Sequence, residues 1–376
     1  MTASRNIPLL DLRAQHEAIR AEILSEVTRL IDSQQFILGE EVAELERRIA
    51  SYCQTPYAIG CASGTDALVL ALMALEIGRG DEVLTVPYTF FATAGAIARV
   101  GARPVFVDVD EETCQMDVSQ VESVLDRHPR VKAILPVHLF GGCVDMDPLL
   151  GFAQARNITV IEDAAQSIGA EYRGRRAGSL GAMGCFSFFP TKNLGGYGDA
   201  GMITTPNAEL ADRLKALRVH GSNRRYYHDW VGINSRLDTL QAAVLLVKLG
   251  HLDAWTQGRQ RNAALYRRLL GYAGLPVRFQ LVPEFVTRHV ANQFIVRVPR
   301  RDELKAALSA AGIGAEIYYP LPLHLQKCFA YLNYRPGDFP ASEKLARESL
   351  ALPVYPELAD EHLEAVCRTI SQFLQA

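Results

Sequence analysis

Short apolar runs alternate with helix-length segments through the first half of the chain. The segments between the runs have helical periodicity and cover 66–75, 91–100, 118–125 and 146–155, while the runs themselves read YAIGCAS, DEVLTVP, ARPVFVDV, VKAILPVHL and ITVIEDAA. This alternation predicts an α/β protein with a mostly parallel sheet and helices on both of its faces. The runs are almost continuously hydrophobic, so we expect strands that are buried on both sides.

Other patterns surround this repeating region. Two helices are expected near the beginning of the chain, and a strand-rich part with the runs CFSFFP and AGMITT follows Gly178. The later pattern, with NQFIVRVP and GAEIYYP, indicates a smaller C-terminal α+β domain. We therefore predict a large domain over 1–250 and a small domain over 251–376. The remaining expected elements are helices at 12–31, 40–52, 208–218, 237–270 and 302–311, and a polar, aromatic loop at 220–235.

The amino-acid composition argues against several classes of protein. Of 376 residues, 49% are hydrophobic and 22% are charged, and the net charge of −3 comes from interspersed acids and bases, so nucleic acid is not an expected partner. The seven cysteines are odd in number and contain no C-x-x-C pair, which argues against disulfides and against a zinc site. Neither a signal peptide nor an apolar stretch of roughly 20 residues is visible, so we expect a cytoplasmic protein that does not span a membrane.

One familiar motif is rejected on its context. Residues 196–201 read GYGDAG, a literal G-x-G-x-x-G match. A dinucleotide site needs this motif to open a helix and to precede an acid by about 20 residues. Here it runs into GMITT, which is typical of a strand, and no acid lies between Asp212 and Asp229. We interpret it as a glycine-rich turn.

A different constellation fits an aldehyde cofactor with a phosphate tail. Such a cofactor needs a lysine for a Schiff base and a carboxylate that keeps its ring nitrogen protonated. Lys192 lies between the apolar run FSFFP and the glycine-rich turn, and Asp163 ends the strand-like ITVIED, where ligands of open α/β sheets bind. Taken singly, Lys192 is equally consistent with a solvated lysine, and Asp163 with a turn cap.

Further side chains supply the other requirements of this cofactor. The sequence SGT ends in Gly64 and Thr65 and opens a helix, where free N–H groups suit a phosphate. Ser187 is a hydroxyl among apolar neighbours, Gln166 could donate to a ring oxygen, and Phe90 could stack on a ring. Ordinary alternatives remain open for each, namely a helix cap, a backbone-bonded hydroxyl, a turn amide and a core aromatic.

Seven segments together resemble the DegT/DnrJ/EryC1/StrS family of nucleotide-sugar aminotransferases. They read ASGTDAL, VPYTFFATA, PVHLFG, EDAAQSIGA, FSFFPTKNLGGYGDAG, GINSRLDTLQAAVL and YYPLPLHLQ. The resemblance implies the fold of aspartate aminotransferase (fold type I of pyridoxal-phosphate enzymes). It also implies pyridoxal 5′-phosphate as cofactor, with pyridoxamine 5′-phosphate formed in turnover. The sequence of the chain is therefore similar to that of a transaminase from about residue 59 to 326.

The resemblance also implies residue roles. Lys192 resembles the Schiff-base lysine and Asp163 the partner of the pyridine nitrogen, while Gln166 is similar to the partner of the ring hydroxyl and Phe90 to the stacking residue. Gly64, Thr65 and Ser187 resemble the phosphate cradle. Asn234 is similar to a residue that the family contributes from the neighbouring subunit, which implies a homodimer with shared active sites.

The expected reaction passes an amino group from L-glutamate, released as 2-oxoglutarate, to a keto group of a dTDP- or UDP-linked sugar. The segment RYYHDWVGINSRLD resembles the branch that acts on 3-keto sugars, so a C3 ketone is favoured. Two alternatives are a sugar dehydratase, whose relatives replace the lysine by histidine, and a non-catalytic regulatory relative. Candidate substrate contacts, each with an alternative as a loop or interface residue, are Tyr226, Tyr227, His228, Arg236, Tyr319 and His324.

Overall fold

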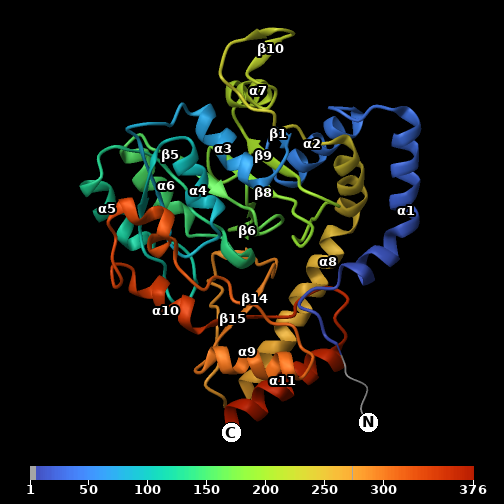
Figure 1. The fold of residues 1–376 in the computed structure, drawn as a ribbon, viewed down its shortest axis with the longest axis vertical. Helices are drawn as coiled ribbons and strands as arrows, with labels where there is room; N and C mark the ends of the chain where they lie inside the picture. Colours follow the sequence, from blue (N-terminus) through green and yellow to red (C-terminus); the bar gives the residue numbers. More distant parts are fainter. Residues whose placement is uncertain (1–5, 273) are drawn as a thin grey trace.

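A seven-stranded sheet forms the centre of the protein in a computed structural model that describes residues 6–272 and 274–376 (Figure 1). The strand order is β1-β9-β8-β5-β4-β2-β3, and every neighbouring pair is parallel except the two pairs that involve β9. The predicted α/β class with a mostly parallel sheet is confirmed. The strands are β1 (Tyr57–Cys61), β2 (Glu82–Thr85), β3 (Arg103–Phe106), β4 (Val131–Ile134), β5 (Thr159–Asp163), β8 (Met183–Ser187) and β9 (Gly201–Thr205).

Helices cover both faces of this sheet because successive strand residues point to opposite sides. Val83 packs in a cluster with α3, α4 and α7, whereas the adjacent Leu84 packs in a second cluster with α5 and α6. The same switch occurs between Ile161 and Val160 on β5. These helices are α3 (Gly64–Ala74), α4 (Ala92–Arg99), α5 (Val121–Arg127), α6 (Met146–Ala155) and α7 (Ala208–Leu217).

The glycine-rich turn leads into a strand, as its context predicts. Residues 196–200 are the last part of the connection from β8 to β9, and β9 runs antiparallel between β1 and β8. Gly201 opens β9, and a Cβ there would lie 2.3 Å from the backbone oxygen of Ser63, so the turn before α3 approaches the start of this strand closely. The interpretation of GYGDAG as a turn is confirmed.

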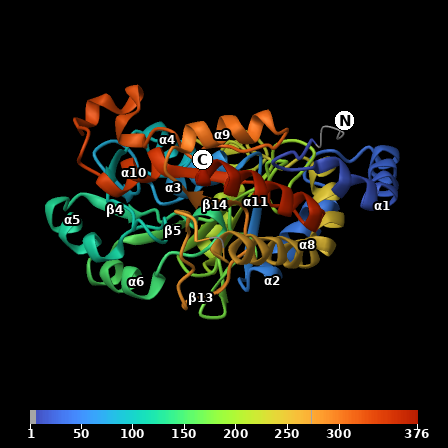
Figure 2. The ribbon, with the colours of Figure 1, turned by 90° about the horizontal axis from the view of Figure 1, so that it is seen from below.

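A smaller antiparallel sheet lies at the bottom of Figure 1. Its order is β12-β14-β15, with bounds β12 (Arg278–Phe279), β14 (Phe294–Arg297) and β15 (Ser349–Leu352). Viewed from below, helices α9, α11 and the end of α8 lie across this region (Figure 2), and their apolar residues share one core with Val296 and Leu350. The helices are α8 (Thr239–Tyr272), α9 (Arg301–Ala310) and α11 (Asp360–Gln375).

The N-terminal helices lie against the long helix α8. Helix α1 (Leu12–Ser33) runs along the right edge of Figure 1 and packs on α8 through Ile19, Ile23 and Val244. Helix α2 (Glu40–Tyr52) joins a core cluster with α8 through Leu45 and Ile49. Helix α8 therefore extends from the large sheet to the small one.

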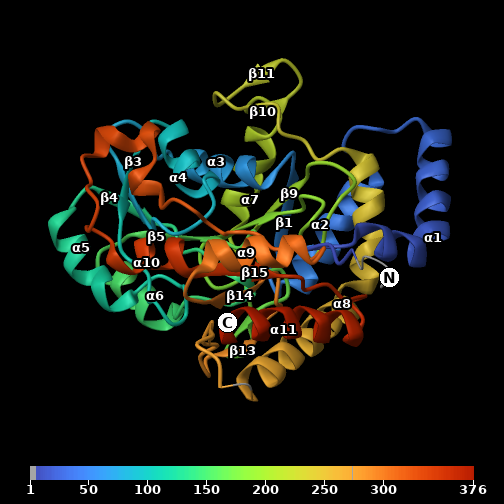
Figure 3. The same ribbon diagram turned by 60° about the horizontal axis from the view of Figure 1, so that its bottom comes forward.

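Some local predictions were wrong. The expected loop at 220–235 contains a two-stranded hairpin of β10 (Ser222–Arg224) and β11 (Tyr227–His228), which projects from the molecule in Figure 3. The segment GAEIYYP contributes only an isolated bridge from Glu316 to Ala351 instead of a strand. Elements that were not predicted include β6 (Glu171–Tyr172), β7 (Arg175–Arg176), β13 (Val286–Arg288) and α10 (Pro340–Glu348). The three strands have only two or three residues each, too few for a periodic signal.

The described residues contain no helix that combines the length and the apolar character of a membrane span. All seven cysteines are free thiols, and only Cys328 among them is exposed.

Candidate active site

A cavity of about 480 Å³ opens where β4, β5 and β8 end, at the carboxyl edge of the parallel strands. Ligands of open α/β sheets bind at this edge. We call it the main cavity. Eight of the residues singled out from the sequence line it: Gly64, Thr65, Phe90, Asp163, Gln166, Ser187, Lys192 and Tyr319.

Asp163 is a buried carboxylate that is held in a fixed orientation. It is the last residue of β5, and its Oδ2 accepts a hydrogen bond of 2.7 Å from Oγ1 of Thr93. Its Oδ1 accepts a second bond of 3.3 Å from the backbone N–H of Ala165. Burial raises the pKa of Asp163, while these donors and the charge of Lys192 lower it. The carboxylate thus has defined partners on one side and faces the cavity on the other.

Lys192 belongs to the turn that joins β8 to β9. Its backbone N–H donates to the Phe189 carbonyl at 2.9 Å, and the turn closes so tightly that a Cβ at Gly195 would lie 2.3 Å from the Pro190 oxygen. Burial lowers the pKa of Lys192 to about 8, and the negative charge of Asp163 opposes that shift. At a pKa of about 8 roughly a tenth of the amine is neutral at pH 7, and this is the form that attacks a carbonyl.

A second buried lysine supports this turn from below. Lys248 on α8 donates from Nζ to the Gly195 carbonyl at 2.7 Å, and Nζ lies 4.5 Å from the centre of the Tyr197 ring. Burial lowers the pKa of Lys248 to about 8 as well. Its amine is engaged with backbone and ring, whereas Lys192 lines the main cavity. The two lysines therefore have similar pKa values, but only the amine of Lys192 is accessible to a ligand in the main cavity.

The beginning of α3 forms a close-fitting backbone edge of the cavity. Ser63 caps this helix by accepting the Asp66 N–H at 3.1 Å, so the first helical residues are Gly64 and Thr65. A Cβ at Gly64 would lie 2.5 Å from the Cβ of Ser187, which explains the need for glycine. The early N–H groups of a helix have no partner within the helix and attract anions.

Gln166 and Tyr319 form a linked pair on another wall. Oε1 of Gln166 accepts the Phe140 N–H at 2.8 Å, and Nε2 donates to the hydroxyl of Tyr319 at 3.1 Å. The second N–H of this amide remains for a ligand. Phe90 is 55% exposed and its ring centre lies 6.1 Å from that of Tyr319, so both rings can contact a flat molecule.

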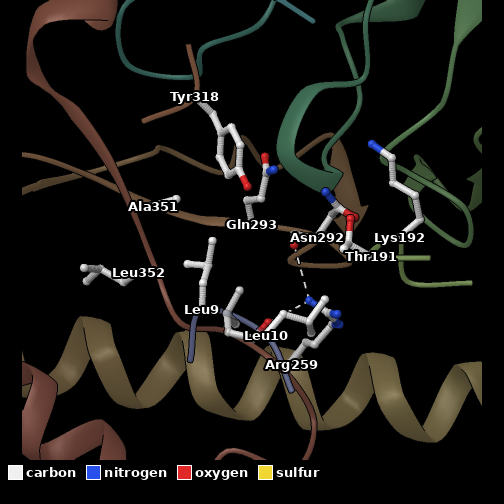
Figure 4. A pocket seen from close by; sticks show the side chains of 11 residues that line it. Leu9, Leu10, Thr191, Lys192, Arg259, Asn292, Gln293, Tyr318, Ala351 and Leu352 are labelled. Carbon is white, nitrogen blue, oxygen red and sulfur yellow. Dashed lines mark hydrogen bonds between the residues drawn. The ribbon is translucent and has the colours of Figure 1, made fainter. Parts of the chain in front are cut away.

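A smaller cavity of about 100 Å³ adjoins Lys192 on the side of α8 (Figure 4). In this view the Lys192 side chain points away from Leu9 and from Arg259. Arg259 is buried and donates from Nη1 to backbone carbonyls, the shortest bond being 2.7 Å to Val354. Burial lowers its pKa to about 10. We interpret Arg259 as a structural residue whose hydrogen bonds hold α8 against the C-terminal segment.

The other predicted contacts are not brought to the main cavity of this chain. Tyr226, Tyr227 and His228 lie on the projecting hairpin, and Tyr226 is 80% exposed. Asn234 is exposed and pairs only through its backbone with Val219. Arg236 is half-buried outside the residues that line the cavity, and His324 is buried, with Nε2 at 3.2 Å from Oε1 of Glu343.

Comparison with known proteins agrees with this geometry. Residues 17–371 match the DegT/DnrJ/EryC1/StrS aminotransferase family. A pleiotropic regulatory protein of Geobacillus stearothermophilus is 49% identical, with 98% of each chain covered. A UDP-N-acetyl-3-dehydro-α-D-glucosamine 3-aminotransferase of Acidithiobacillus ferrooxidans is 46% identical over the whole of both chains. The crystal structure of Streptomyces venezuelae DesV with a ketimine intermediate aligns with a TM-score of 0.95, 42% identity and 99% of each chain covered.

The chain belongs to the DegT/DnrJ/EryC1/StrS aminotransferase family. The likeness extends over the full fold, including the sheet edge that carries Lys192 and Asp163. The protein is therefore an enzyme of the aminotransferase type with this family's α/β fold.

In this aminotransferase, several residues of the main cavity were missed by the sequence analysis. They are Thr89, Phe189, Thr191, Asp199, Gln293 and Tyr318 at the wall, and Thr93 behind Asp163. Thr93 carried a usable signal, because it is a polar residue that lies three positions after Phe90 in an apolar helix. Gln293 and Tyr318 come from the C-terminal half, and no local pattern connects them to the large sheet.

Proposed function

We propose that this enzyme transfers the amino group of L-glutamate to the C3 keto group of a nucleotide-linked sugar with pyridoxal 5′-phosphate as cofactor. The observation that supports it most is the placement of Lys192 and Asp163 on one cavity, each acting on the pKa of the other. An amine with a lowered pKa on the same cavity as a buried carboxylate is the pair that this cofactor requires. Free thiols throughout the chain favour the cytoplasm as its location.

The residues present fit the cofactor. Gly64, Thr65 and Ser187 would hold its phosphate, because glycine keeps the helix start open to an anion. Asp163 would bind the ring nitrogen, and Gln166 has an amide N–H to spare for the ring oxygen. When bound, pyridoxal phosphate supplies an aldehyde carbon and a protonated ring that withdraws electrons from it.

Lys192 serves two purposes in this proposal. With the cofactor present, the neutral amine of Lys192 would hold its aldehyde carbon, and once an amino donor has taken that place, Nζ would be free to accept a proton. The pKa of about 8 suits an amine that takes up and returns a proton near neutral pH. The hydrogen bond from Thr93 lowers the pKa of Asp163 against the raising effect of burial, which favours a negative partner for the ring nitrogen.

The sugar specificity is inferred from the relatives and from the predicted contacts. The Acidithiobacillus relative is named for a UDP-linked 3-dehydro sugar, which supports the C3 position. UDP and dTDP carriers both remain candidates. Tyr319 lines the main cavity and is the one predicted sugar contact that this chain places there, since the other five lie elsewhere.

We propose that the enzyme acts as a homodimer with shared active sites. The hairpin β10–β11 projects from the molecule (Figures 1 and 3) with Tyr226 and Tyr227 exposed, and Asn234 is exposed in the segment that follows it. Helix α1 presents Leu24 and Ile31 with exposed fractions of 45% and 48%. Apolar side chains exposed on one helix favour contact with another protein surface. Predicted contact residues that lie outside the main cavity of their own chain would then line the main cavity of a second copy.

Two other functions are less well supported. A sugar dehydratase of this family would have histidine in place of Lys192. A regulatory role is suggested by the name of the Geobacillus relative. Such a role does not require Lys192 and Asp163 to share a cavity with a cradle for phosphate, and this chain retains all of these features. Catalysis therefore accounts for more of the structure.

Spectroscopy of the purified holoenzyme tests the proposal. We expect a visible absorption band from the lysine-linked cofactor, which L-glutamate removes and 2-oxoglutarate restores. Reduction with borohydride followed by peptide mass analysis should place the cofactor on Lys192. Lys248 is the internal control, because its pKa is similar but its amine is engaged with Gly195.

The outcomes separate the parts of the proposal. Lys192→Ala should lose the visible band, and a band that persists, or cofactor mass on Lys248, would overturn the assignment of the lysine. Failure of L-glutamate alongside success of another amine would replace the donor. Incubation with 3-keto and 4-keto sugar nucleotides, followed by NMR of the products, identifies the carbon that receives nitrogen.

A further inference from the structure

A buried serine contacts the backbone that would hold the cofactor phosphate. Ser235 lies in the segment between β11 and α8 and is 0% exposed, so its hydroxyl is enclosed by residues of its own chain. Its Oγ accepts the backbone N–H of Ala62 at 3.1 Å and donates to Oδ2 of Asp66 at 2.7 Å. This one side chain therefore bridges the turn after β1 and the first turn of α3.

The two partners of this hydroxyl flank the expected phosphate cradle in the sequence. Ala62 comes directly before Ser63, which caps α3 by accepting the N–H of Asp66. Gly64 and Thr65 follow Ser63 and line the main cavity. Their N–H groups lie at the start of a helix, where they have no helical partner and attract anions. A hydroxyl bonded on both sides of this stretch restrains the backbone that would meet the phosphate.

Asp66 places a negative charge in the same helical turn as the cradle. Thr65 and Leu68 of α3 line the main cavity, whereas the Asp66 carboxylate is bonded to Ser235. An acid is favourable at the beginning of a helix, but a carboxylate that turned towards a bound phosphate would repel it. A serine hydroxyl has one hydrogen to donate, and Ser235 donates it to Asp66. The hydrogen bond therefore fixes the direction of this charge.

Ser235 is itself held in place by a buried ion pair. Its backbone N–H donates to the Arg218 carbonyl at 3.0 Å. Nη1 of Arg218 donates to the Gly60 carbonyl at 2.7 Å and to Oε1 of Glu46 at 2.5 Å, and the same carboxylate oxygen accepts the Gly60 N–H at 2.8 Å. Arg218 is only 8% exposed. Because these bonds join Ser235 to β1, its hydroxyl has a fixed position beside the start of α3.

We propose that Ser235 is a positioning residue for the cofactor phosphate. It restrains the start of α3 through Ala62 and keeps the Asp66 carboxylate directed towards itself. A phosphate at Gly64 and Thr65 then meets N–H groups without an opposing negative charge. This inference rests on the proposed function, because it concerns the cofactor of that reaction.

Calorimetric titration of the cofactor-free chain with 4′-deoxypyridoxine phosphate tests the inference. This probe carries the phosphate but has no aldehyde, so bonding to Lys192 does not contribute to its Kd. Ser235→Ala should weaken its binding about tenfold, the size of effect expected for one hydrogen bond to a charged group. Ser235→Cys fills the space with a weak donor and should weaken binding in the same direction with less disturbance of packing. A thermal unfolding scan checks that each variant folds.

Ser342→Ala is the matched control. Ser342 is also 0% exposed, and its Oγ donates to Oδ1 of Asp108 at 2.5 Å. The pair lies at the beginning of α10, and neither residue lines the main cavity. The two alanine variants lose the same type of buried bond, so both should unfold at a lower temperature. Only Ser235→Ala should change the Kd of the phosphate probe.

Phosphorus NMR of the holoenzyme supplies a readout that a loss of stability would not move. The resonance of bound pyridoxal phosphate responds to nearby charge, so it should shift in Ser235→Ala and keep its position in Ser342→Ala. Asp66→Asn removes the negative charge and keeps an oxygen that can accept from Ser235. Adding Ser235→Ala to Asp66→Asn should therefore weaken the probe by less than about threefold, because only the restraint through Ala62 is then lost.

The results separate this inference from the proposed function. A wild-type Kd in both Ser235 variants, an equal loss in Ser342→Ala, or an undiminished loss in the Asp66→Asn background would overturn the role of Ser235. Each of these results leaves the proposed function in place as long as L-glutamate removes the visible band of the holoenzyme. Failure of the wild type to bind pyridoxal phosphate, or to respond to any amino donor, would remove the proposed function itself.

Discussion

The main cavity and the projecting hairpin contrast in how completely one chain builds them. Around the cavity, Asp163 is buried and bonded to Thr93, and Lys192 is partly buried in the connection between β8 and β9. On the hairpin, Tyr226 and Tyr227 are exposed at 80% and 60% and form pairs only with neighbouring arginines. The main cavity has the fixed geometry that covalent chemistry needs. The hairpin exposes side chains that can contact another molecule.

The main cavity and the hairpin are therefore expected to have different roles in the enzyme. Charged groups that are already held in place in a buried site do not have to reorient during the reaction. They therefore stabilise the charge that develops in the transition state effectively. The exposed side chains of the hairpin have no fixed orientation until a second surface packs on them. We therefore expect changes near the cavity to act on cofactor chemistry, and changes on the hairpin to act on substrate binding.

The largest effect is expected from Asp163→Asn, which keeps the shape and removes the charge. Overall turnover should fall by about 10²–10³-fold, as for the loss of other buried electrostatic partners. Stopped-flow absorbance with L-glutamate measures the rate. Thr93→Val and Thr93→Ser form the companion pair, because only serine preserves the bond to Oδ2 of Asp163. Normal rates in Asp163→Asn would contradict the assignment of the ring partner.

A smaller effect is expected from pH on the capture of cofactor by the cofactor-free enzyme. The pKa of Lys192 is lowered to about 8, so its reactive neutral form increases as pH rises and dominates above that value. The capture rate should rise about tenfold per pH unit below 8 and level off above pH ~9. Binding of 4′-deoxypyridoxine phosphate, which lacks the aldehyde, is the control and should not show this rise. A capture rate independent of pH would contradict the lowered pKa.

Gly64→Ala should act on the phosphate end of the cavity. The added Cβ would lie 2.5 Å from the Cβ of Ser187, so the start of α3 must shift and cofactor affinity should fall about tenfold. Fluorescence titration with pyridoxal phosphate measures this affinity.

Gly250→Ala is the matched change in an open position of α8, where a Cβ meets no atom within 4 Å. It should leave cofactor affinity unchanged and raise the free energy of unfolding by about 0.5–1 kcal/mol, since alanine favours a helix. Equal cofactor affinities in the two alanine variants would show that the phosphate binds elsewhere.

The smallest effect is expected from Tyr226→Ala on the hairpin. The free energy of unfolding in urea should change by less than about 0.5 kcal/mol, because the side chain is exposed. The KM for the keto sugar nucleotide should rise about threefold, the size of a peripheral contact. Hybrids formed by mixing Tyr226→Ala with Lys192→Ala should retain one intact site. A hybrid whose remaining activity shows the raised KM of Tyr226→Ala would argue against sites shared between subunits.

The sequence predicted the cofactor side of the site well for a physical reason. Asp163, Lys192 and the start of α3 each follow a strand of one sheet, and the carboxyl ends of parallel strands meet at one edge. Helix α6 was predicted with the bounds that the structure has, since its apolar face is long and regular. Where hydrophobic periodicity and strand order fix the backbone, side chains at strand ends are placed with it.

Other features were beyond the sequence because they depend on packing between distant segments. Gln293 and Tyr318 reach the main cavity from the C-terminal half, and Phe329 stacks on Phe91 across more than half of the chain. His324 was expected at the substrate but pairs with Glu343 in a buried position. The sequence by itself determined the sheet, the turn of Lys192 and the carboxylate opposite it, through local periodicity and glycine. Only the tertiary structure decided which walls enclose them, because contacts between remote side chains have no local pattern.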